Sequence, residues 1–501
     1  MRYFLLFISA LLFSFVTFTE VDWIEAGSGE TLPATFDAKN PGGKLGFINA
    51  LGELETKNHP FFEPLGTNGR ACVTCHQPKN GMSLSVETLN ERWEQTRGKD
   101  PVFAAIDGSD NPKWPQHLRE SHSLLLNRGL FRVALPWPVK EDQGLPVESE
   151  FTIEVVSDPT GVNLDPDLGL FSSNPKISVY RRPRPVANMT YVMSPDPRFN
   201  IKTGILAATD PETGKTVGMN MLADSRFYTQ KEQALDAYFG HMEGVNGLTP
   251  EELNQIIHFE NNLFMAQSHD RWGKPLVVNG KPEGLGPIAM KNSPVHILGN
   301  RPESPIFHYF NEWLTDSEQT KGLMEEQKEF RRSVARGNDI FMFREFWIKD
   351  VTHINSIGLA NPIRRSCSTC HNGQMTGMDI APGWVDLGTT NYPTWTDNVM
   401  AMEESELPVF KCTCKEDAPA HPYLGRVIYT TDPGRALATG KCTDIGAITM
   451  QQFRGLSARA PYFVNGSAAT LLELVDYYDR RFDMKLKEQE KTDLVNFLSV
   501  L

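Results

Sequence analysis

The sequence is poor in cysteine, in histidine and in positive charge. Seven cysteines and 12 histidines are spread over 501 residues, and 49 lysines and arginines face 62 aspartates and glutamates, which gives a net charge of −13. This balance argues against non-specific binding to nucleic acid, because a basic surface is what attracts a phosphate backbone. It is compatible with docking of a basic protein partner.

Long apolar runs are also scarce, and the clearest one lies at the N-terminus. Met1-Arg2-Tyr3 precedes an apolar stretch from Phe4 to Phe18. One positive charge followed by a short apolar stretch is typical of a secretory signal, and the stretch is short for a spanning helix. Because no clear small-residue cleavage site follows, residues 1–20 are expected to be a signal peptide or an uncleaved N-terminal anchor, with no other membrane contact.

Four of the few cysteines form a repeated pattern. Cys72-Val73-Thr74-Cys75-His76 and Cys367-Ser368-Thr369-Cys370-His371 both have the form Cys-x-x-Cys-His, the attachment pattern of a c-type haem. Two thiols one short turn apart reach the two vinyl groups of a porphyrin, and the next residue lies under the iron as its proximal ligand. Coincidence is a poor explanation for two such matches, so we expect two covalently bound haems.

The alternative interpretation of these motifs is a zinc knuckle or a redox-active cysteine pair. Zinc takes four local Cys or His ligands, and neither motif has another Cys or His close by. Haem attachment also agrees with the N-terminal signal, because bacteria attach c-type haem outside the cytoplasm. The protein is therefore expected to be periplasmic.

The other three cysteines are Cys412, Cys414 and Cys442. An exported protein permits disulfides. A Cys414–Cys442 bond would leave Cys412 free, and pairing through Cys412 stays open. A bond between Cys412 and Cys414 is the least favourable, because so short a loop strains the disulfide geometry.

Local patterns predict a mainly α protein. Thr229, Thr249 and Thr470 each begin a capping box, a typical helix start. Further helical patterns run from Lys328 to Phe341 and around Leu494, Phe497 and Leu498, and a weak one from Lys44 to Leu54. The alternation of Glu150 to Val155 predicts a strand, with Ile177 to Tyr180 as its partner. The expected fold is thus helical, with a small β decoration in the N-terminal half.

Two further features bear on haem binding. His122 is a candidate distal ligand, although a lone histidine is more often a structural residue. Arg181, Arg182 and Arg184 form a basic run, which would either hold haem propionates through charge-assisted hydrogen bonds or be solvated.

Several segments around the motifs are similar to one family. These segments resemble the bacterial di-haem cytochrome c peroxidases and the related MauG-type enzymes. The similar segments are Leu65-Gly66-Thr67-Asn68-Gly69-Arg70-Ala71-Cys72, Leu124-Leu125-Leu126-Asn127, Thr431-Asp432-Pro433-Gly434-Arg435-Ala436-Leu437 and Leu456-Ser457-Ala458-Arg459-Ala460-Pro461-Tyr462-Phe463-Val464-Asn465-Gly466.

The resemblance implies two cytochrome c-like haem domains. Residues 21–268 would form the N-terminal domain and residues 326–501 the C-terminal one. Residues 269–325, which begin with a stretch rich in Gly, Pro and Asn, would be a linker or surface excursion. In this family the first haem meets peroxide and the second stores or relays an electron.

The resemblance also implies iron ligands. His76 and His371 match the proximal ligands. Tyr478 stands where the peroxidases usually place a Met on the second haem, and a Tyr there resembles the MauG branch; a phenolate-type ligand stabilises ferric and higher-valent iron. Tyr478 is otherwise a core residue on its helix. Met375 and Met378 are alternative ligands, or packing residues.

Other site residues follow from the same resemblance. Gln233 and Glu243 have the spacing of the family's distal pair, in which the Glu moves a peroxide proton; His241 is an alternative for that role, or would ligate the iron and block it. Asn127, Arg459 and Pro461 match a calcium site built from an amide side chain and two carbonyls.

One departure from the family concerns the route between the haems. The family commonly has a Trp there, whereas the matching stretch from Val192 to Arg198 has none. The leading hypothesis is a peroxidase that reduces hydrogen peroxide with electrons from a small redox protein. The alternatives are a MauG-like oxidase of a protein or small-molecule partner, and a non-catalytic electron carrier.

Overall fold

The computed structural model describes residues 19–140, 146–192, 198–200, 205–207, 221–227, 229–292, 310–351, 361–371, 384–392 and 405–501. The apolar stretch up to Phe18 and both Met375 and Met378 lie outside this part of the chain. Within it, no helix is both long enough and apolar enough to cross a membrane.

Strands are abundant and occur along the whole chain. Of the described residues, 32% are helical and 20% are in strands. The prediction of a mainly α fold, with two cytochrome c-like domains and β structure confined to a small decoration of the N-terminal half, is therefore wrong. Many of the strands have only two or three residues, too few for an alternating pattern to be recognised.

The helices are α1 Cys72–Cys75, α2 Val86–Thr96, α3 Ser123–Arg128, α4 Met189–Val192, α5 Gln230–His241, α6 Pro250–Asn262, α7 Gly286–Asn292, α8 Glu325–Phe343, α9 Ala436–Thr439, α10 Leu471–Phe482 and α11 Glu488–Ser499. The strands are β1 Thr19–Glu20, β2 Thr31–Leu32, β3 Thr35–Asn40, β4 Gly43–Asn49, β5 Leu54–Glu55, β6 Phe131–Pro136, β7 Phe151–Ser157, β8 Lys176–Arg181, β9 Arg198–Asn200, β10 Ile205–Ala207, β11 Leu263–His269, β12 Phe346–Ile348, β13 Ile363–Arg365, β14 Trp384–Val385, β15 Asn391–Tyr392, β16 Val409–Cys414, β17 Val427–Thr430 and β18 Ile448–Thr449.

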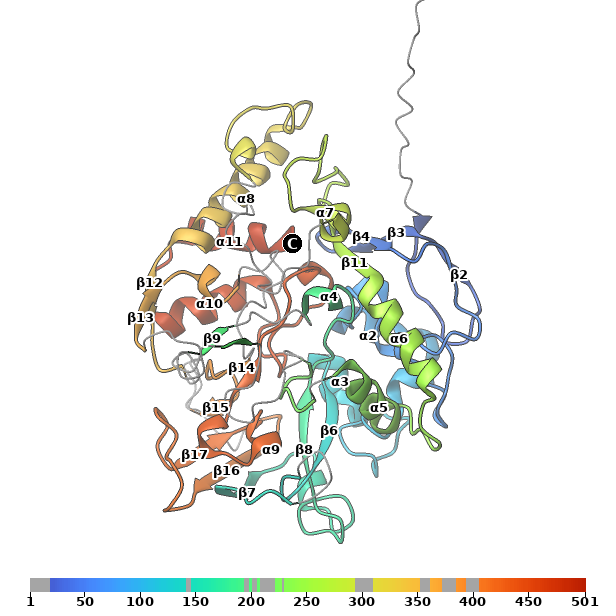
Figure 1. The fold of residues 1–501 in the computed structure, drawn as a ribbon, viewed down its shortest axis with the longest axis vertical. Coiled ribbons are helices and arrows are strands. Elements are labelled where there is room, and N and C mark those ends of the chain that lie inside the picture. The colour runs from blue at the N-terminus through green and yellow to red at the C-terminus, as the bar shows by residue number, and fades with distance from the viewer. Residues whose placement is uncertain are drawn as a thin grey trace, which may run out of the picture.

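A four-stranded sheet of order β1-β3-β4-β11 forms one side of the molecule (Figure 1). The helix predicted from Lys44 to Leu54 is wrong, because Gly43–Asn49 is strand β4, paired with β3 and β11. Its residues from Leu45 to Asn49 are all buried, so the strand lacks the alternation that marks a half-exposed one. Phe36 of β3 stacks on Phe47 of β4, and this core also packs against Cys72.

A second four-stranded sheet, of order β15-β17-β16-β7, joins distant parts of the chain at the lower end of Figure 1. The predicted strand is confirmed as β7, but its predicted partner is wrong. β7 pairs with β16, more than 250 residues later, while β8 pairs with β6. A partner so far away in sequence leaves no local signal. The domain boundaries stay a prediction.

The predicted helices are confirmed as α5, α6, α8, α10 and α11. The Thr229 and Thr249 capping boxes are complete. At α10, Thr470 accepts from the Glu473 N–H, whereas the Glu473 carboxylate accepts from Ala469.

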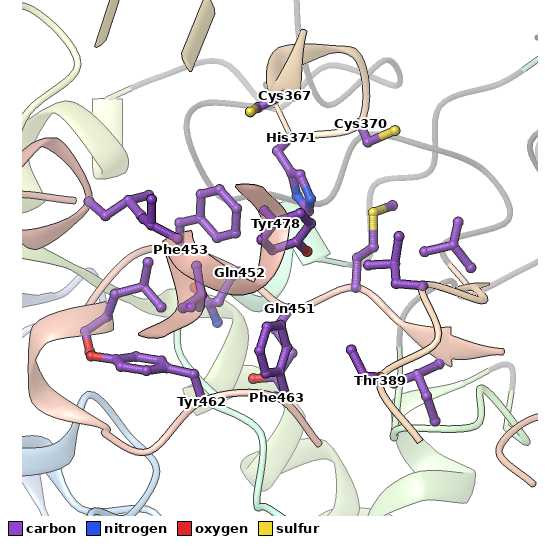
Figure 2. Close-up of a pocket in the computed structure, with 18 of the residues that line it drawn as sticks. Cys367, Cys370, His371, Thr389, Gln451, Gln452, Phe453, Tyr462, Phe463 and Tyr478 are labelled. Atoms are coloured by element: carbon purple, nitrogen blue, oxygen red, sulfur yellow. The ribbon is translucent and has the colours of Figure 1, made fainter. Parts of the chain in front are cut away.

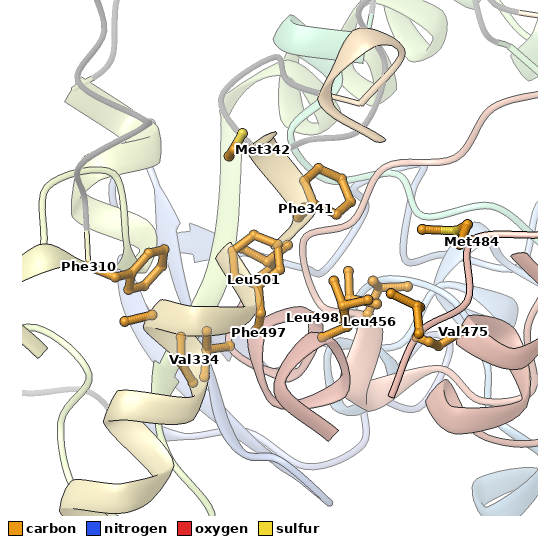
Figure 3. Close-up of a cluster of buried hydrophobic side chains, with 14 of the residues drawn as sticks. Phe310, Val334, Phe341, Met342, Leu456, Val475, Met484, Phe497, Leu498 and Leu501 are labelled. Atoms are coloured by element: carbon orange, nitrogen blue, oxygen red, sulfur yellow. The ribbon is translucent and has the colours of Figure 1, made fainter. Parts of the chain in front are cut away.

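Helices α8, α10 and α11 pack together through an apolar cluster (Figure 3). It includes Phe341 of α8, Val475 of α10, and Phe497 and Leu498 of α11. A Cβ on Gly337 of α8 would lie 2.0 Å from the Asp493 carbonyl oxygen, so the close approach of α8 and α11 requires glycine there. The segment predicted as linker or excursion is not a surface linker throughout. It contains α7, and it contributes four buried side chains to the core. These are Leu276, Leu285, Phe310 and Trp313.

The three remaining cysteines meet beside the second sheet. Cys414 and Cys442 form a disulfide with Cα atoms 5.8 Å apart, and Cys412 is buried and free. The first of the sequence-based pairings is thus confirmed.

We predict that Cys442→Ser lowers the free energy of unfolding by about 3–4 kcal/mol, the entropy expected for a loop of this length, since the bonded cysteines are 28 residues apart in sequence. Urea unfolding without reductant measures the change. With reductant, wild type and variant should unfold at closely similar concentrations. Equal stability of the two proteins without reductant would contradict the assignment.

Candidate haem sites

The first Cys-x-x-Cys-His motif forms a single helical turn. The Ala71 N–H donates to the Thr74 hydroxyl at 3.0 Å, which starts α1, and His76 ends it. The His76 Nδ1 lies 2.9 Å from the Met82 carbonyl oxygen. This contact orients the ring and leaves Nε2 as the ligand atom, as is usual for a metal-binding histidine. Burial lowers the pKa of His76 to about 4, so the imidazole is neutral and its Nε2 lone pair is available.

Cys72, Cys75 and His76 line one wall of a cavity with about 1370 Å³ of empty space, which we call the first cavity. The cavity is thus built around the motif, with both thiols and the imidazole on its wall. The other walls carry Gln233 and His241 of α5.

The segment before the motif holds the end of α5 in place. The Asn68 side-chain amide and the Arg70 guanidinium both donate to the His241 carbonyl, at 2.9 and 3.0 Å. A Cβ on Gly66 would lie 1.7 Å from the Met242 carbonyl oxygen, so this contact requires glycine. The motif and the predicted distal residues are thus fixed relative to each other.

His241 belongs to a polar network with Asp107 and Arg70. Its Nδ1 lies 2.5 Å from Asp107 Oδ2, and Arg70 pairs with the same carboxylate. Burial alone would raise the pKa of Asp107, but the charge of Arg70 and the hydrogen bond from His241 outweigh it and lower that pKa. Asp107 therefore stays ionised and holds the imidazole by Nδ1, which leaves Nε2 for other partners.

Glu243 is not brought together with Gln233 and His241. It lies two residues past the end of α5 in the left-handed region, with φ 53°, and its side chain is exposed and outside the cavity lining. Its carbonyl accepts from Thr67 at 3.2 Å. The helix ends before the spacing of ten residues can return Glu243 to the face that carries Gln233.

Glu260 of α6 also lines the first cavity and was missed by the sequence analysis. It is 5% exposed, and burial raises its pKa to about 8 although Gln230 donates to it at 3.3 Å. A carboxylate beside Ile256 and Phe259 on the apolar face of a helix was the signal available in the sequence.

The second motif lies in another cavity, with about 1600 Å³ of empty space, which we call the second cavity. Cys367 begins a short 3₁₀ turn, and the His371 ring stacks on Phe453 with centroids 4.7 Å apart. In Figure 2, His371 points from the motif into this cavity. Its walls are mostly apolar, and they come from the segment between Ile448 and Val464 together with α8, α10 and α11.

Tyr478 of α10 lies in the second cavity with the motif (Figure 2). Burial, and then the nearby thiols of Cys367 and Cys370, raise its pKa. Two neighbouring tyrosines donate to carbonyls, Tyr477 to Leu387 and Tyr462 to Leu456. Among the described residues, none forms a hydrogen bond with the Tyr478 hydroxyl.

Arg182, Pro183 and Gln452 line both cavities and so lie between them. Arg182 donates to the carbonyls of Leu84, Arg128 and Arg459. No aromatic side chain lies on both cavity walls in the described part of the chain. Residues 193–197, which belong to the stretch that matches the family's Trp-containing segment, lie outside the described residues.

Arg182, Arg184 and Arg459 form what we call the arginine cluster. Arg184 lines the first cavity and donates to Thr449 and Met450 carbonyls, and Arg459 lines the second. Arg182 and Arg459 are 6% and 5% exposed. No carboxylate pairs with the cluster within the described ranges. Burial, and then the charge of Arg459, lower the pKa of Arg182 and of Arg184 to about 9.

This uncompensated charge suits an anionic group in each cavity, because a buried cation is costly unless it is paired. Haem propionates have that charge. The alternative that these arginines are solvated is wrong for Arg182, which is buried. Arg181 has carboxylate partners already, since it is buried between Asp224 and Asp432.

His122 is a structural residue here. Its two ring nitrogens lie 2.7 and 3.0 Å from the carbonyl oxygens of Gly108 and Gln116, and it packs on Trp93 and Phe103. It does not line the first cavity. The candidate role as a distal ligand is therefore not supported.

Pro461 links the predicted calcium ligands. It lines one cavity with Asn127, Asn80 and Ser85, and it lines the second cavity with Arg459. The Arg459 carbonyl also accepts from Arg182 at 2.9 Å. Calcium binding at these residues stays a prediction.

The motif thiols are not of the reactive kind. Burial raises the pKa of Cys72, and it raises the pKa of Cys75 and of Cys367 to about 12. Redox-active cysteines have lowered pKa values. The described part of the chain contains no group of three or more His, Cys, Asp or Glu side chains that could hold a metal ion.

Comparison with known proteins agrees with the motifs. No protein-family model matches the sequence. Cytochrome-c peroxidases IdrP1 of Denitromonas iodatirespirans and of Pseudomonas sp. (strain SCT) are each 26% identical over 28% of this chain. The matches span 37% of the length of these relatives.

Two solved structures were also found. A MauG-like protein associated with microbial copper homeostasis is 16% identical, with 63% of this chain and 80% of that chain covered and a TM-score of 0.26. Hydrazine synthase of Kuenenia stuttgartiensis is 14% identical, with 83% and 93% covered and a TM-score of 0.30. At such TM-scores neither superposition supports an argument about fold.

The sequence matches therefore agree with the resemblance to cytochrome c peroxidases that the motifs indicate, over 28% of this chain.

We predict that Glu260→Gln removes a pH dependence of stability. The folded state keeps a proton on Glu260 up to about pH 8, whereas the unfolded chain loses it near the usual pKa of 4.5. Stability should therefore fall as the pH rises from 4.5 to 8, by on the order of a few kcal/mol. Chemical unfolding across this range measures it, with Glu251→Gln, an exposed residue of the same helix, as control. A Glu260→Gln profile as steep as that of wild type would contradict the assignment.

Proposed function

We propose that this chain is a di-haem c-type cytochrome that reduces hydrogen peroxide in the first cavity, with electrons from a small redox protein relayed through the second. The observation that carries this proposal is that each Cys-x-x-Cys-His motif lines its own large cavity, and that the cavities share a wall containing Arg182. Peroxide takes up two electrons and two protons and leaves as two water molecules.

The residues around each cavity suit a covalently bound haem. Cys72 and Cys75 would form its thioethers in the first cavity, with His76 as proximal ligand. Cys367, Cys370 and His371 would do so in the second. The arginine cluster would pair with the propionates. When bound, the haem of the first cavity supplies the iron that receives peroxide and the electrons that break its O–O bond.

His241 is the residue best placed to move the peroxide proton. Asp107 would accept from Nδ1, which would leave Nε2 as the atom that takes a proton, and His241 lines the first cavity. It would take the proton from one peroxide oxygen and deliver it to the other, as a general acid–base group does. Gln233, on the same helix, would orient the peroxide through its side-chain amide.

Tyr478 favours a second candidate, a MauG-like oxidase of a protein or small molecule. The phenol lies near the thiols of the second motif and lacks a hydrogen-bond partner among the described residues. As sixth ligand it would stabilise higher oxidation states of the second iron, which suits storage of oxidising equivalents rather than simple relay.

We also propose that the protein works outside the cytoplasm, in the periplasm. The Cys414–Cys442 disulfide supports this location, because such bonds persist in oxidising compartments. The short apolar run before Phe18 would direct export.

The spin states of the two irons test the proposal. EPR of the purified ferric protein at neutral pH should give one high-spin and one low-spin signal, because peroxide needs an open iron. Two low-spin signals in the ferric protein, together with a low-spin signal from the one iron that stays ferric after addition of one electron, would mean that neither iron opens, and the protein would then be an electron carrier.

We predict that Tyr478→Phe changes the spectrum of the second haem and leaves that of the first unchanged, because the phenol oxygen is the proposed ligand. Absorption and EPR spectra of the ferric protein measure this. Tyr477→Phe is the matched control, since Tyr477 donates to Leu387 instead. Identical spectra for Tyr478→Phe and wild type would remove the ligand assignment.

We predict that His241→Ala slows the reaction with peroxide by about 10²-fold or more, the usual contribution of a general acid–base group. Glu243→Gln should change the rate little, because Glu243 is exposed and outside the cavity. Stopped-flow mixing with peroxide measures both rates. A faster reaction of His241→Ala would mean that His241 blocks the iron, and a slow Glu243→Gln would move the proton role to Glu243.

A further inference from the structure

A second hollow adjoins the first cavity, and we call it the outer cleft. It has about 2390 Å³ of empty space and lies between the end of α5, strand β6, the start of β8 and helix α9. Val133, Arg226 and His241 line both it and the first cavity. A small molecule in the outer cleft would therefore lie next to His241, the residue proposed to act on peroxide.

The outer cleft is rich in positive charge although the chain is acidic. Its lining contains two acidic residues, Asp167 and Asp236, and six basic ones. Asp236 is paired with Arg226, and Asp167 with Lys113. The basic residues are Arg132, Lys140, Lys176, Arg226, Arg435 and Lys441. A concave surface of one sign concentrates ligands of the opposite sign.

Arg132 gives the outer cleft a buried cation without a counter-ion. It is 8% exposed, and it donates to the Ile106 carbonyl and to the Ser178 hydroxyl. Its Nε has no hydrogen-bond partner, and no carboxylate pairs with it in the described ranges. Burial lowers the pKa of Arg132. An unpaired buried cation is costly, and an anion in the cleft would offset that cost.

The same cleft also offers apolar surface. Phe239 is 49% exposed and lies on its wall with Phe227 and Leu437. A half-exposed aromatic ring beside cations suits a ligand with both a charge and a flat apolar body.

We propose that the outer cleft binds a small aromatic carboxylate next to His241. Lys140 and Lys176 contact the carboxylate, the buried charge of Arg132 attracts it, and Phe239 packs on the ring. This inference rests on the proposed function, because it names the substrate class of the oxidase alternative. Binding of the carboxylate can nevertheless be measured without turnover.

Calorimetric titration of the haem-loaded protein with benzoate and with benzamide tests the proposal. The two probes have the same ring and nearly the same shape, and only benzoate is charged. Benzoate should bind at one site and at least about tenfold more tightly than benzamide, as hydrogen bonds to a charged group allow. Equal affinities, or no benzoate binding, would overturn the proposal.

Variants locate the bound benzoate. Lys176→Gln and Lys140→Gln, both in the lining of the cleft, should each weaken benzoate binding several-fold and leave benzamide unchanged. Lys321→Gln, an exposed lysine outside the cleft, should bind benzoate as wild type does. Equal weakening by all three would mean a non-specific charge effect and would overturn the site. If the protein reduces peroxide but does not bind benzoate, only this inference is wrong. If it binds benzoate but does not reduce peroxide, only the proposed peroxidase function is wrong.

Discussion

Arg182 is a buried cation between two cavities, each lined by one Cys-x-x-Cys-His motif. Its guanidinium donates three hydrogen bonds to carbonyl oxygens. With Arg184 and Arg459 it places positive charge where no described carboxylate compensates it. Carbonyl dipoles offset only part of the cost of burying a cation. This cluster therefore needs anionic partners, and the propionates of a haem in each cavity would supply them.

The fold serves to bring distant segments to this wall. The segment before Cys72 grips the end of α5 through Asn68 and Arg70, which fixes His241 across the first cavity from His76. Helices α8, α10 and α11 and the segment between Ile448 and Val464 contribute the walls of the second cavity, which holds His371 and Tyr478. The pairing of β7 with β16 ties the N-terminal half to the C-terminal half, so that neither cavity is made by one continuous stretch of chain.

Local chemistry in the sequence was a good guide, and long-range pairing was not. The haem motifs, the capping boxes at Thr229 and Thr249 and the Cys414–Cys442 pair are short-range or compositional signals. The partner of β7 was missed because β16 lies more than 250 residues away. Strand β4 was mistaken for a helix because residues 45–49 are all buried and show no alternation.

The candidate site shows the same division. The spacing of Gln233 and His241 on one helix placed both in the first cavity, because α5 continues through both. The spacing to Glu243 failed because α5 ends at His241, and the left-handed backbone at Glu243 turns its side chain outward. Glu260 and the arginine cluster gain their meaning only from burial, which a sequence without its tertiary contacts does not reveal.

Each motif is proposed to hold one covalent haem, and intact mass spectrometry of the denatured protein, produced with a cytochrome c maturation system, counts the attached haems. The wild-type chain should gain the mass of two haems. We expect one haem on Cys72→Ala/Cys75→Ala and one on Cys367→Ala/Cys370→Ala. A wild-type chain that carries no haem, or a double variant that still carries two, would contradict this proposal.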